Sequence, residues 1–280
     1  MERATGLEHL TMLDIDPPEL VSLAAKAGFD TVSLRIAPVT VSEDAWPVFP
    51  GSPMLAETLR RCADTGVTVL GAEAIAVGPE SDLTGCGSVI ETAAALGARY
   101  LNVICDDQDT NRFAERFAAL TEAARPYRVR PVIEFNAYRP VRTLAGAVTI
   151  AESSAGGGVL LDSLHIQRCG ISLDELAGVD PALLSYLQLC DAPLKQPHGL
   201  PVPAAMPRGQ HVDEGDDAVL EARSMRLLPG DGELPLARLI SMLPCDLPVS
   251  VEAPSLLARS EFSAGEYAAQ ARRSLDQLLS

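Results

Sequence analysis

The chain has 280 residues, of which 47% are hydrophobic, and it carries a formal net charge of −16. This acidic excess argues against binding to a nucleic-acid backbone, which requires clustered Lys and Arg. No apolar run approaches the roughly 18 residues of a membrane-spanning helix, and residues 1–10 lack the apolar stretch of a secretion signal. The six cysteines have no disulfide-framework spacing, so we interpret them as reduced. We therefore expect a cytoplasmic protein that acts on a small molecule, without a nucleic-acid or membrane partner.

Short apolar segments alternate along the chain with longer, alanine-rich segments of helical character. The predicted strands, in chain order, are 7–13, 31–36, one within 67–76, 100–105, 130–135, 159–161, 185–190 and 248–252. The predicted helices are 17–26, 53–65, 88–96, 112–124, 142–153, 235–242 and 264–279, with short helical pieces near residues 173 and 181. Residues 191–228, rich in proline and charge, are predicted to form one long loop, which is a candidate lid.

Eight strand–helix units predict a single (β/α)8 TIM barrel over residues 1–280. The strands are too apolar for a half-exposed sheet, which favours a parallel sheet covered by helices. A doubly wound fold would usually carry a glycine-rich loop after its first strand. Here the sequence Asp14-Ile15-Asp16-Pro17 follows the first strand and contains no glycine.

Oxygen-bearing side chains stand at or near the ends of the last four predicted strands. They are Glu134, Asp162, Gln188 and Glu252, and His165 follows three residues after Asp162. In such barrels the chemistry is found at the C-terminal strand ends, and neighbouring strands lie about 4.8 Å apart, so these groups can converge. Three crowded carboxylates repel one another unless a cation neutralises them. The set suits one divalent metal ion, Mn²⁺ or Mg²⁺ first, with Co²⁺ and Zn²⁺ as alternatives.

Each of these residues also has a purely structural interpretation. A strand-end Asp or Glu can cap a turn or form an ion pair, as Glu252 could with Arg226, and Gln188 could be a core amide. His165 could simply donate to a backbone carbonyl. Four such coincidences on successive strands are less frequent than one shared site.

These patterns resemble the xylose isomerase-like TIM-barrel superfamily, which includes sugar phosphate isomerases and epimerases. The resemblance covers nearly the whole chain and rests on Ile133-Glu134-Phe135, Asp162-x-x-His165, Gln188-x-x-Asp191, Pro229-Gly230-Asp231-Gly232-Glu233 and Val251-Glu252. It implies a divalent metal held by Glu134, Asp162, Gln188 and Glu252. Gln188 departs from the histidine of most epimerases in the family and is similar to the ligand set of 3-dehydroshikimate dehydratases. Because the superfamily commonly forms dimers, a homodimer is a candidate assembly.

We expect a metal-dependent isomerase or epimerase of carbohydrate metabolism that acts on a small sugar-like or hydroxy-ketone substrate. Glu134 or Glu252 would remove the proton next to a carbonyl that the metal polarises, and the other would return it. The first alternative is a lyase of the 3-dehydroshikimate dehydratase type, with His165 as acid or base. The second alternative is a non-catalytic barrel that binds a ligand.

Arginines are the natural contacts for a carboxylate or phosphate on the substrate. We favour Arg226, which follows the long loop, and then Arg168 and Arg35. Arg168 could instead pair on the surface with Asp174 or Glu175. Arg35 interrupts an apolar strand and needs a partner, for which Glu73 on the next strand is a candidate.

Overall fold

A closed barrel of eight parallel strands forms the centre of the molecule. The computed structural model describes residues 3–82 and 85–280. The strands pair in sequence order, and β1 pairs with β8 to close the ring. They are β1 (Thr5–Glu8), β2 (Thr31–Arg35), β3 (Thr68–Val77), β4 (Tyr100–Cys105), β5 (Arg130–Glu134), β6 (Gly158–Asp162), β7 (Leu184–Leu189) and β8 (Val249–Val251). The predicted (β/α)8 barrel is confirmed.

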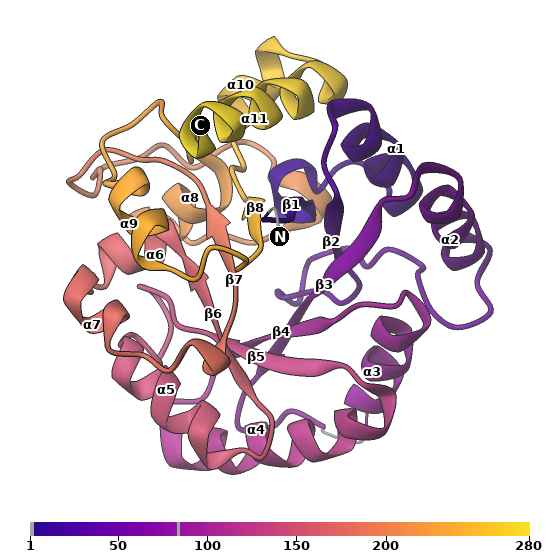
Figure 1. The fold of residues 1–280 in the computed structure, drawn as a ribbon, viewed down its shortest axis with the longest axis vertical. Coiled ribbons are helices and arrows are strands. Elements are labelled where there is room, and N and C mark those ends of the chain that lie inside the picture. The colour runs from indigo at the N-terminus through magenta and orange to yellow at the C-terminus, as the bar shows by residue number, and fades with distance from the viewer. Residues whose placement is uncertain (1–2, 83–84) are drawn as a thin grey trace.

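Helices surround the barrel as an outer ring (Figure 1). They are α1 (Pro17–Ala27), α2 (Pro53–Thr65), α3 (Cys86–Ala95), α4 (Thr110–Ala124), α5 (Leu144–Ser153), α6 (Ser163–Arg168), α7 (Leu173–Ala177), α8 (Asp217–Ser224), α9 (Leu236–Met242), α10 (Leu256–Glu261) and α11 (Ala264–Leu279). Short 3-10 turns are η1 (His9–Met12), η2 (Arg125–Tyr127), η3 (Pro181–Leu183) and η4 (Pro207–Gly209). The start of α1 is typical, because the Asp16 side chain accepts from the Glu19 N–H and Pro17 follows directly. Within the described ranges, no helix is long and apolar enough to cross a membrane.

Two predictions about element boundaries were wrong. The first strand was predicted over 7–13, but β1 ends at Glu8 and the chain turns into η1. Met12 and Leu13 are buried, and their apolar character extended the predicted strand beyond its real end. The segment 191–228 is only partly a loop, because it contains η4 and α8.

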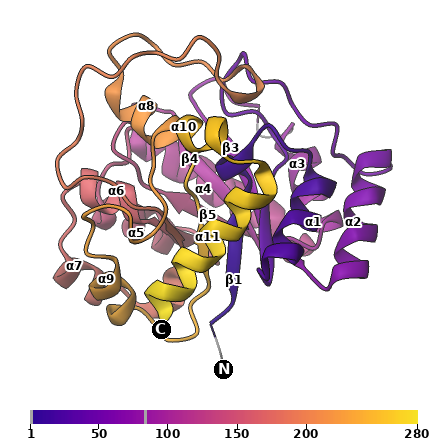
Figure 2. The ribbon, with the colours of Figure 1, turned by 90° about the horizontal axis from the view of Figure 1, so that it is seen from above.

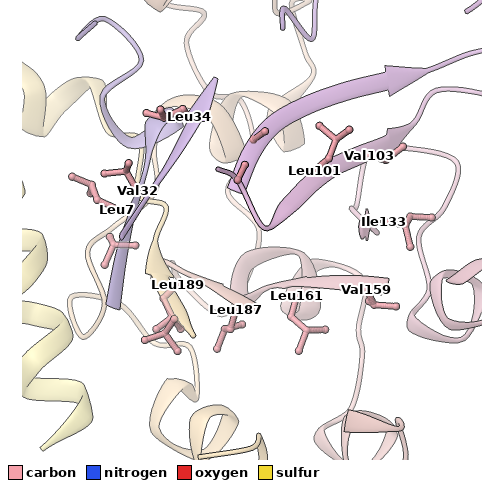
Figure 3. Close-up of a cluster of buried hydrophobic side chains, with 14 of the residues drawn as sticks. Leu7, Val32, Leu34, Leu101, Val103, Ile133, Val159, Leu161, Leu187 and Leu189 are labelled. Carbon is pink, nitrogen blue, oxygen red and sulfur yellow. The ribbon is translucent and has the colours of Figure 1, made fainter. Parts of the chain in front are cut away.

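Side chains alternate along each strand between an apolar outer face, which packs against the helices, and the barrel interior, whose polarity increases toward the C-terminal strand ends. Buried aliphatic side chains from β1, β2 and β4 to β7 form the large cluster under the helices (Figure 3). A second cluster contains the side chains of Leu70, Tyr100, Val132, Leu160 and Tyr186. Two residues further along four of these strands, and therefore on the same face, are Asn102, Glu134, Asp162 and Gln188. The interior thus changes from apolar to polar toward the C-terminal strand ends.

The connection after β7 extends over this polar end of the barrel. Figure 2 shows α8 and its flanking segments at one end, while the chain termini lie at the other. The fold therefore presents the strand-end groups to a covered mouth.

Candidate functional site

The strand ends and the segments above them enclose a small cavity. It has a volume of about 30 Å³. The predicted site residues among those that line it are Arg35, Glu73, Glu134, His165, Arg226 and Glu252. Asp162 and Gln188 lie beside it, fully buried and hydrogen-bonded to lining residues.

The Arg226 guanidinium lies among the carboxylates. Its Nη1 donates to Asp162 Oδ2 at 2.6 Å and lies 3.1 Å from Glu252 Oε2. Its Nε donates to the Ala222 carbonyl at the end of α8, at 2.7 Å, which fixes the side chain in place. Burial alone would raise the pKa of Asp162, but the charge and hydrogen bond of Arg226 together with the contributions of His165 outweigh it and hold that pKa below its usual range. The pairing of Glu252 with Arg226 considered from the sequence is therefore present.

Asp162 also caps the helix α6, which explains its three-residue spacing from His165. Its Oδ1 accepts from the His165 backbone N–H at 2.9 Å and so caps α6. The cap places His165 Nε2 3.6 Å from Glu134 Oε1. Burial lowers the pKa of His165 to about 4, so its ring is neutral at neutral pH. Burial and the Asp162 charge raise the pKa of Glu134 to about 7.

Gln188 joins the end of β1 to the end of β8. Its Nε2 donates to Glu8 Oε2 at 3.1 Å and to Glu252 Oε1 at 3.0 Å. Its Oε1 is buried and has no hydrogen-bond partner in the described part of the chain. Burial and the Glu73 charge raise the pKa of Glu8 to about 8, so Glu8 is largely protonated at neutral pH. Glu8 was not predicted as a site residue, because the first strand was placed too far along the chain.

Arg35 and Arg168 differ in their relation to the cavity. Arg35 Nε lies 3.3 Å from Glu73 Oε2, which confirms the predicted partner, and both residues line the cavity. Arg168 is not among the lining residues. Its guanidinium contacts Glu221 at 2.6 Å and donates to the Pro193 carbonyl at 2.8 Å, so it ties α6 to the connection after β7. The carboxylate partner of Arg168 is thus Glu221, not the Asp174 or Glu175 considered from the sequence.

Two segments distant in sequence meet above the mouth. They are 36–52, after β2, and 191–216, after β7. The Arg208 guanidinium lies 3.9 Å from the centre of the Trp46 ring, and Ser42 Oγ donates to the Gly209 carbonyl at 2.7 Å. We call these two segments the paired cover. Because a cavity of about 30 Å³ has room for little more than a water molecule or an ion, its walls must move apart to admit a sugar-sized molecule.

Sequence reasoning missed several residues that line the cavity. Asn102 Nδ2 donates to Glu134 Oε2 at 2.6 Å. Its position within an apolar strand was a usable signal. Tyr138, Arg139 and Arg223 also line the cavity, from the connections after β5 and β7. Nothing in a single sequence distinguishes these three residues, of which Arg223 lies on α8, from exposed ones.

Two groups of buried side chains have ligand atoms close enough together to hold a cation. In the first, Glu134, Asp162 and His165, the atoms all lie within 4.8 Å of one another. The same holds for the second group, Glu8, Glu73 and Glu252. Arg226 links the two groups, because its Nη1 contacts Asp162 of the first group and Glu252 of the second.

The fold and these strand-end groups define a (β/α)8 barrel with a carboxylate-rich mouth. The chain belongs to the xylose isomerase-like TIM barrel family, whose sequence profile matches residues 21–278. No curated protein matched in a search with this chain.

Solved structures share the fold at low sequence identity. The IOLI protein, crystallised with a zinc atom, is 20% identical, with 98% of this chain and 97% of that chain covered and a TM-score of 0.74. A D-psicose 3-epimerase is 13% identical, with coverage of 98% and 97% and a TM-score of 0.70. The probable 3-DHS dehydratase AsbF from Bacillus anthracis is 12% identical, with 99% of each chain covered and a TM-score of 0.71. At these identities the similarity shows the fold.

Proposed function

We propose that this protein is a divalent-metal-dependent isomerase or epimerase that acts on a small sugar-like or hydroxy-ketone substrate. The observation that carries the proposal is the charge in the buried mouth. Glu134, Asp162 and Glu252 are at most 6% exposed. Burial raises the pKa of Glu134 to about 7 and that of Glu252 well above its usual range, so both carboxyls ionise fully only when a cation is present. In their ionised forms the three carry three negative charges, of which the Arg226 guanidinium balances one. The remaining two match the charge of one divalent cation.

The proposed donors also have the chemistry that such an ion prefers, with Glu134 and Asp162 in one close group and Glu252 in the other. Carboxylate and amide oxygens are the ligands that Mn²⁺ and Mg²⁺ prefer. Gln188 Oε1 and His165 Nδ1 are buried acceptors without a partner in the described part of the chain. Glu134, Asp162, Gln188 and Glu252 would hold the ion. The structural neighbours described as zinc-bound or as an epimerase are consistent with this assignment.

The chain's own residues supply the proton transfers. A bound divalent ion would act as a Lewis acid toward the substrate carbonyl. Glu134 accepts the proton from the carbon next to that carbonyl, and Glu252 delivers a proton to the opposite face. Asn102 holds Glu134 in position through its 2.6 Å hydrogen bond. The paired cover excludes water while the proton is held.

One observation favours a lyase as the second candidate. His165 Nε2 lies 3.6 Å from Glu134 Oε1, so an acid–base group adjoins the proposed base. After Glu134 has removed the substrate proton, the neutral His165 ring would take that proton from Glu134 and pass it to the departing β-hydroxyl, which leaves as water. Gln188 in place of the histidine of most epimerases supports this version, as does the similarity to AsbF.

A different observation favours a non-catalytic barrel. Arg226 already contacts Asp162 and Glu252, so the protein supplies part of the neutralising charge itself. In that case the cavity would bind a ligand without an ion.

Metal content separates these possibilities. We would measure Mn²⁺ binding by elemental analysis of wild type, Glu252→Gln and the exposed control Glu115→Gln. The expected result is close to one ion per chain in wild type and in the control, with at least about tenfold weaker binding in Glu252→Gln. Absence of bound ion in wild type after incubation with Mn²⁺ and Mg²⁺ would overturn the metal-dependent function and leave the ligand-binding barrel.

The proton transfer can be tested before the substrate is identified. Candidate keto sugars and 3-dehydroshikimate are incubated with Mn²⁺-loaded protein in D₂O, and deuterium incorporation next to the carbonyl is followed by NMR. Glu134→Gln should lower the incorporation rate by about a hundredfold or more, while Glu115→Gln should not. An epimer as product identifies the isomerase, and a dehydrated product identifies the lyase. A Glu134→Gln rate equal to wild type would exclude Glu134 as the base.

A further inference from the structure

The cavity wall contains a buried arginine, Arg223, that has no ion-pair partner among the described residues. Arg223 is only 7% exposed. Its Nη1 donates to the His211 carbonyl at 2.9 Å, and within residues 3–82 and 85–280 it pairs with no carboxylate. The other arginines that line the cavity each contact an acid: Arg35 with Glu73, Arg139 with Asp106 and Arg226 with Asp162. A buried guanidinium without a counter-charge is costly, which indicates that its partner comes from outside the chain.

Arg139 lies on the same wall. Its Nη1 contacts Asp106, while its Nε is buried without a partner in the described part of the chain. The guanidinium carbons of Arg139 and Arg223 lie 5.8 and 6.0 Å from the centre of the Tyr138 ring. Tyr138 in turn meets His165 edge-on, with ring centres 5.5 Å apart. The two guanidinium groups therefore flank one aromatic ring that reaches the strand-end site.

These three residues separate the inner cavity from a larger outer hollow. The hollow has a volume of about 430 Å³ and is also lined by Tyr138, Arg139 and Arg223. Asp213 and Asp216 line the hollow but not the inner cavity. Asp213 contacts His211 Nε2 at 2.8 Å, and Asp216 caps α8 by accepting from the Val219 N–H at 3.3 Å. The uncompensated positive charge thus lies at the wall, next to the inner cavity.

We propose that Tyr138, Arg139 and Arg223 form a subsite for a carboxylate group of the substrate. Arg139 and Asp106 neutralise each other, so the wall offers one net positive charge, which matches a monoanionic carboxylate better than a phosphate dianion. The guanidinium fork suits the two oxygens of a carboxylate. The role of this subsite rests on the proposed function, and it specifies the substrate as a polyhydroxy ketone that carries an acid group.

Matched ligands test the subsite without knowledge of the natural substrate. D-gluconate and D-glucitol differ at one carbon, which is a carboxylate in the first and a hydroxymethyl group in the second. D-glucose 6-phosphate serves as the phosphate probe. We would measure the dissociation constant of each by calorimetry on Mn²⁺-loaded wild type, Arg223→Gln, Arg223→Lys and the exposed control Arg238→Gln.

We expect wild type and Arg238→Gln to bind gluconate at least about tenfold more tightly than glucitol. Arg223→Gln should lose this preference, and Arg223→Lys should retain part of it because the charge remains. Equal affinity of wild type for gluconate and glucitol would overturn the proposal. So would a preference that survives in Arg223→Gln, or tighter binding of the phosphate probe.

Two further measurements keep the outcomes distinct. Arg223→Gln should bind Mn²⁺ as wild type does, because Arg223 contacts none of the proposed ligands. Gluconate preference in a wild type that binds no Mn²⁺ would refute the metal-dependent function and leave the subsite standing. Arg139→Gln provides a second variant in case Arg223→Gln fails to fold, and it should also weaken gluconate selectively.

Discussion

At the scale of single residues, Arg226 is the cation that contacts two of the buried strand-end carboxylates. Its side chain is 1% exposed and contacts Asp162 and Glu252. In metal-free protein, Arg226→Met leaves both carboxylates buried without this cation, and we expect the free energy of unfolding to fall by about 3–5 kcal/mol. Urea denaturation with a chelator present measures this loss.

The same variant links Arg226 to the proposed metal ion. Since the ion would replace the lost charge, saturating Mn²⁺ should stabilise Arg226→Met more than it stabilises wild type. The exposed control Arg60→Met should respond to Mn²⁺ as wild type does. An equal response of Arg226→Met and wild type would show that the ion and the guanidinium do not share the carboxylates.

His9 gives a pH-dependent prediction away from the proposed ligands. Its Nδ1 accepts from the Arg35 N–H at 3.0 Å and its Nε2 donates to the Ile15 carbonyl at 2.7 Å, an arrangement that requires the neutral ring. Burial lowers the pKa of His9 to about 4. The unfolded chain, with a His pKa near 6.5, binds the proton first as pH falls. The contribution of His9 to stability is therefore complete above about pH 6.5 and declines between about pH 6.5 and 4.

We expect the destabilisation by His9→Gln to be smaller at pH 5 than at pH 8. Urea denaturation of both proteins at both pH values measures it, and the other titrating groups cancel in the difference. A destabilisation independent of pH would contradict the assignment of a neutral, buried ring.

Sequence could identify residues whose position follows from the strand pattern. Glu134 and Asp162 end apolar strands, and the barrel fold then places them together. Arg139 and Arg223 were beyond such reasoning, because their place at the cavity wall depends on loop paths that no periodicity encodes. In the motif Asp162-x-x-His165, the aspartate has both a structural and a site role, because one carboxylate oxygen caps α6 and the other accepts from Arg226.

At the scale of elements, the paired cover depends on one glycine. Gly209 has φ +71°, and a Cβ there would lie 2.8 Å from the Ser42 carbonyl oxygen. Gly215 in the same segment has φ +84° and nothing within 4 Å of its Cβ position. Both Gly→Ala changes carry the cost of a left-handed backbone, roughly 1–2 kcal/mol, but only Gly209→Ala also pushes the two segments apart.

We expect Gly209→Ala to change the fluorescence of Trp46 and to speed proteolytic cleavage within 191–216. Gly215→Ala should leave the fluorescence unchanged. Identical behaviour of the two variants would mean that the contact with Ser42 does not hold the cover.

At the scale of the whole molecule, the last helix is tied to the closing strand of the barrel. The Tyr267 hydroxyl, on α11, donates to the Ala253 carbonyl just after β8 at 2.6 Å, and Tyr267 is 1% exposed. Tyr267→Phe removes this donor, and we expect a loss of about 1–3 kcal/mol in the free energy of unfolding. Urea denaturation measures it, with the half-exposed Tyr127→Phe as a control that should change little.

The barrel itself was predictable because eight apolar segments of strand length alternate with amphipathic helices, a pattern with few alternative solutions. The errors arose where tertiary contacts override local pattern. Residues 9–12 are apolar enough for a strand but turn across the mouth, where the His9 N–H donates to Glu73 Oε1 at 2.8 Å. The short helix α6 begins directly after β6, where the Asp162 side chain caps its first turn.

The small cavity beneath the paired cover also limits how fast a ligand can bind and leave. A ligand larger than a water molecule has no room in the cavity of about 30 Å³ until its walls move apart. Binding and release of such a ligand therefore wait for the surrounding loops to move, which loops of this kind do in microseconds to milliseconds. If the proposed reaction is fast, this opening limits its rate, and viscous solvents should then slow the reaction.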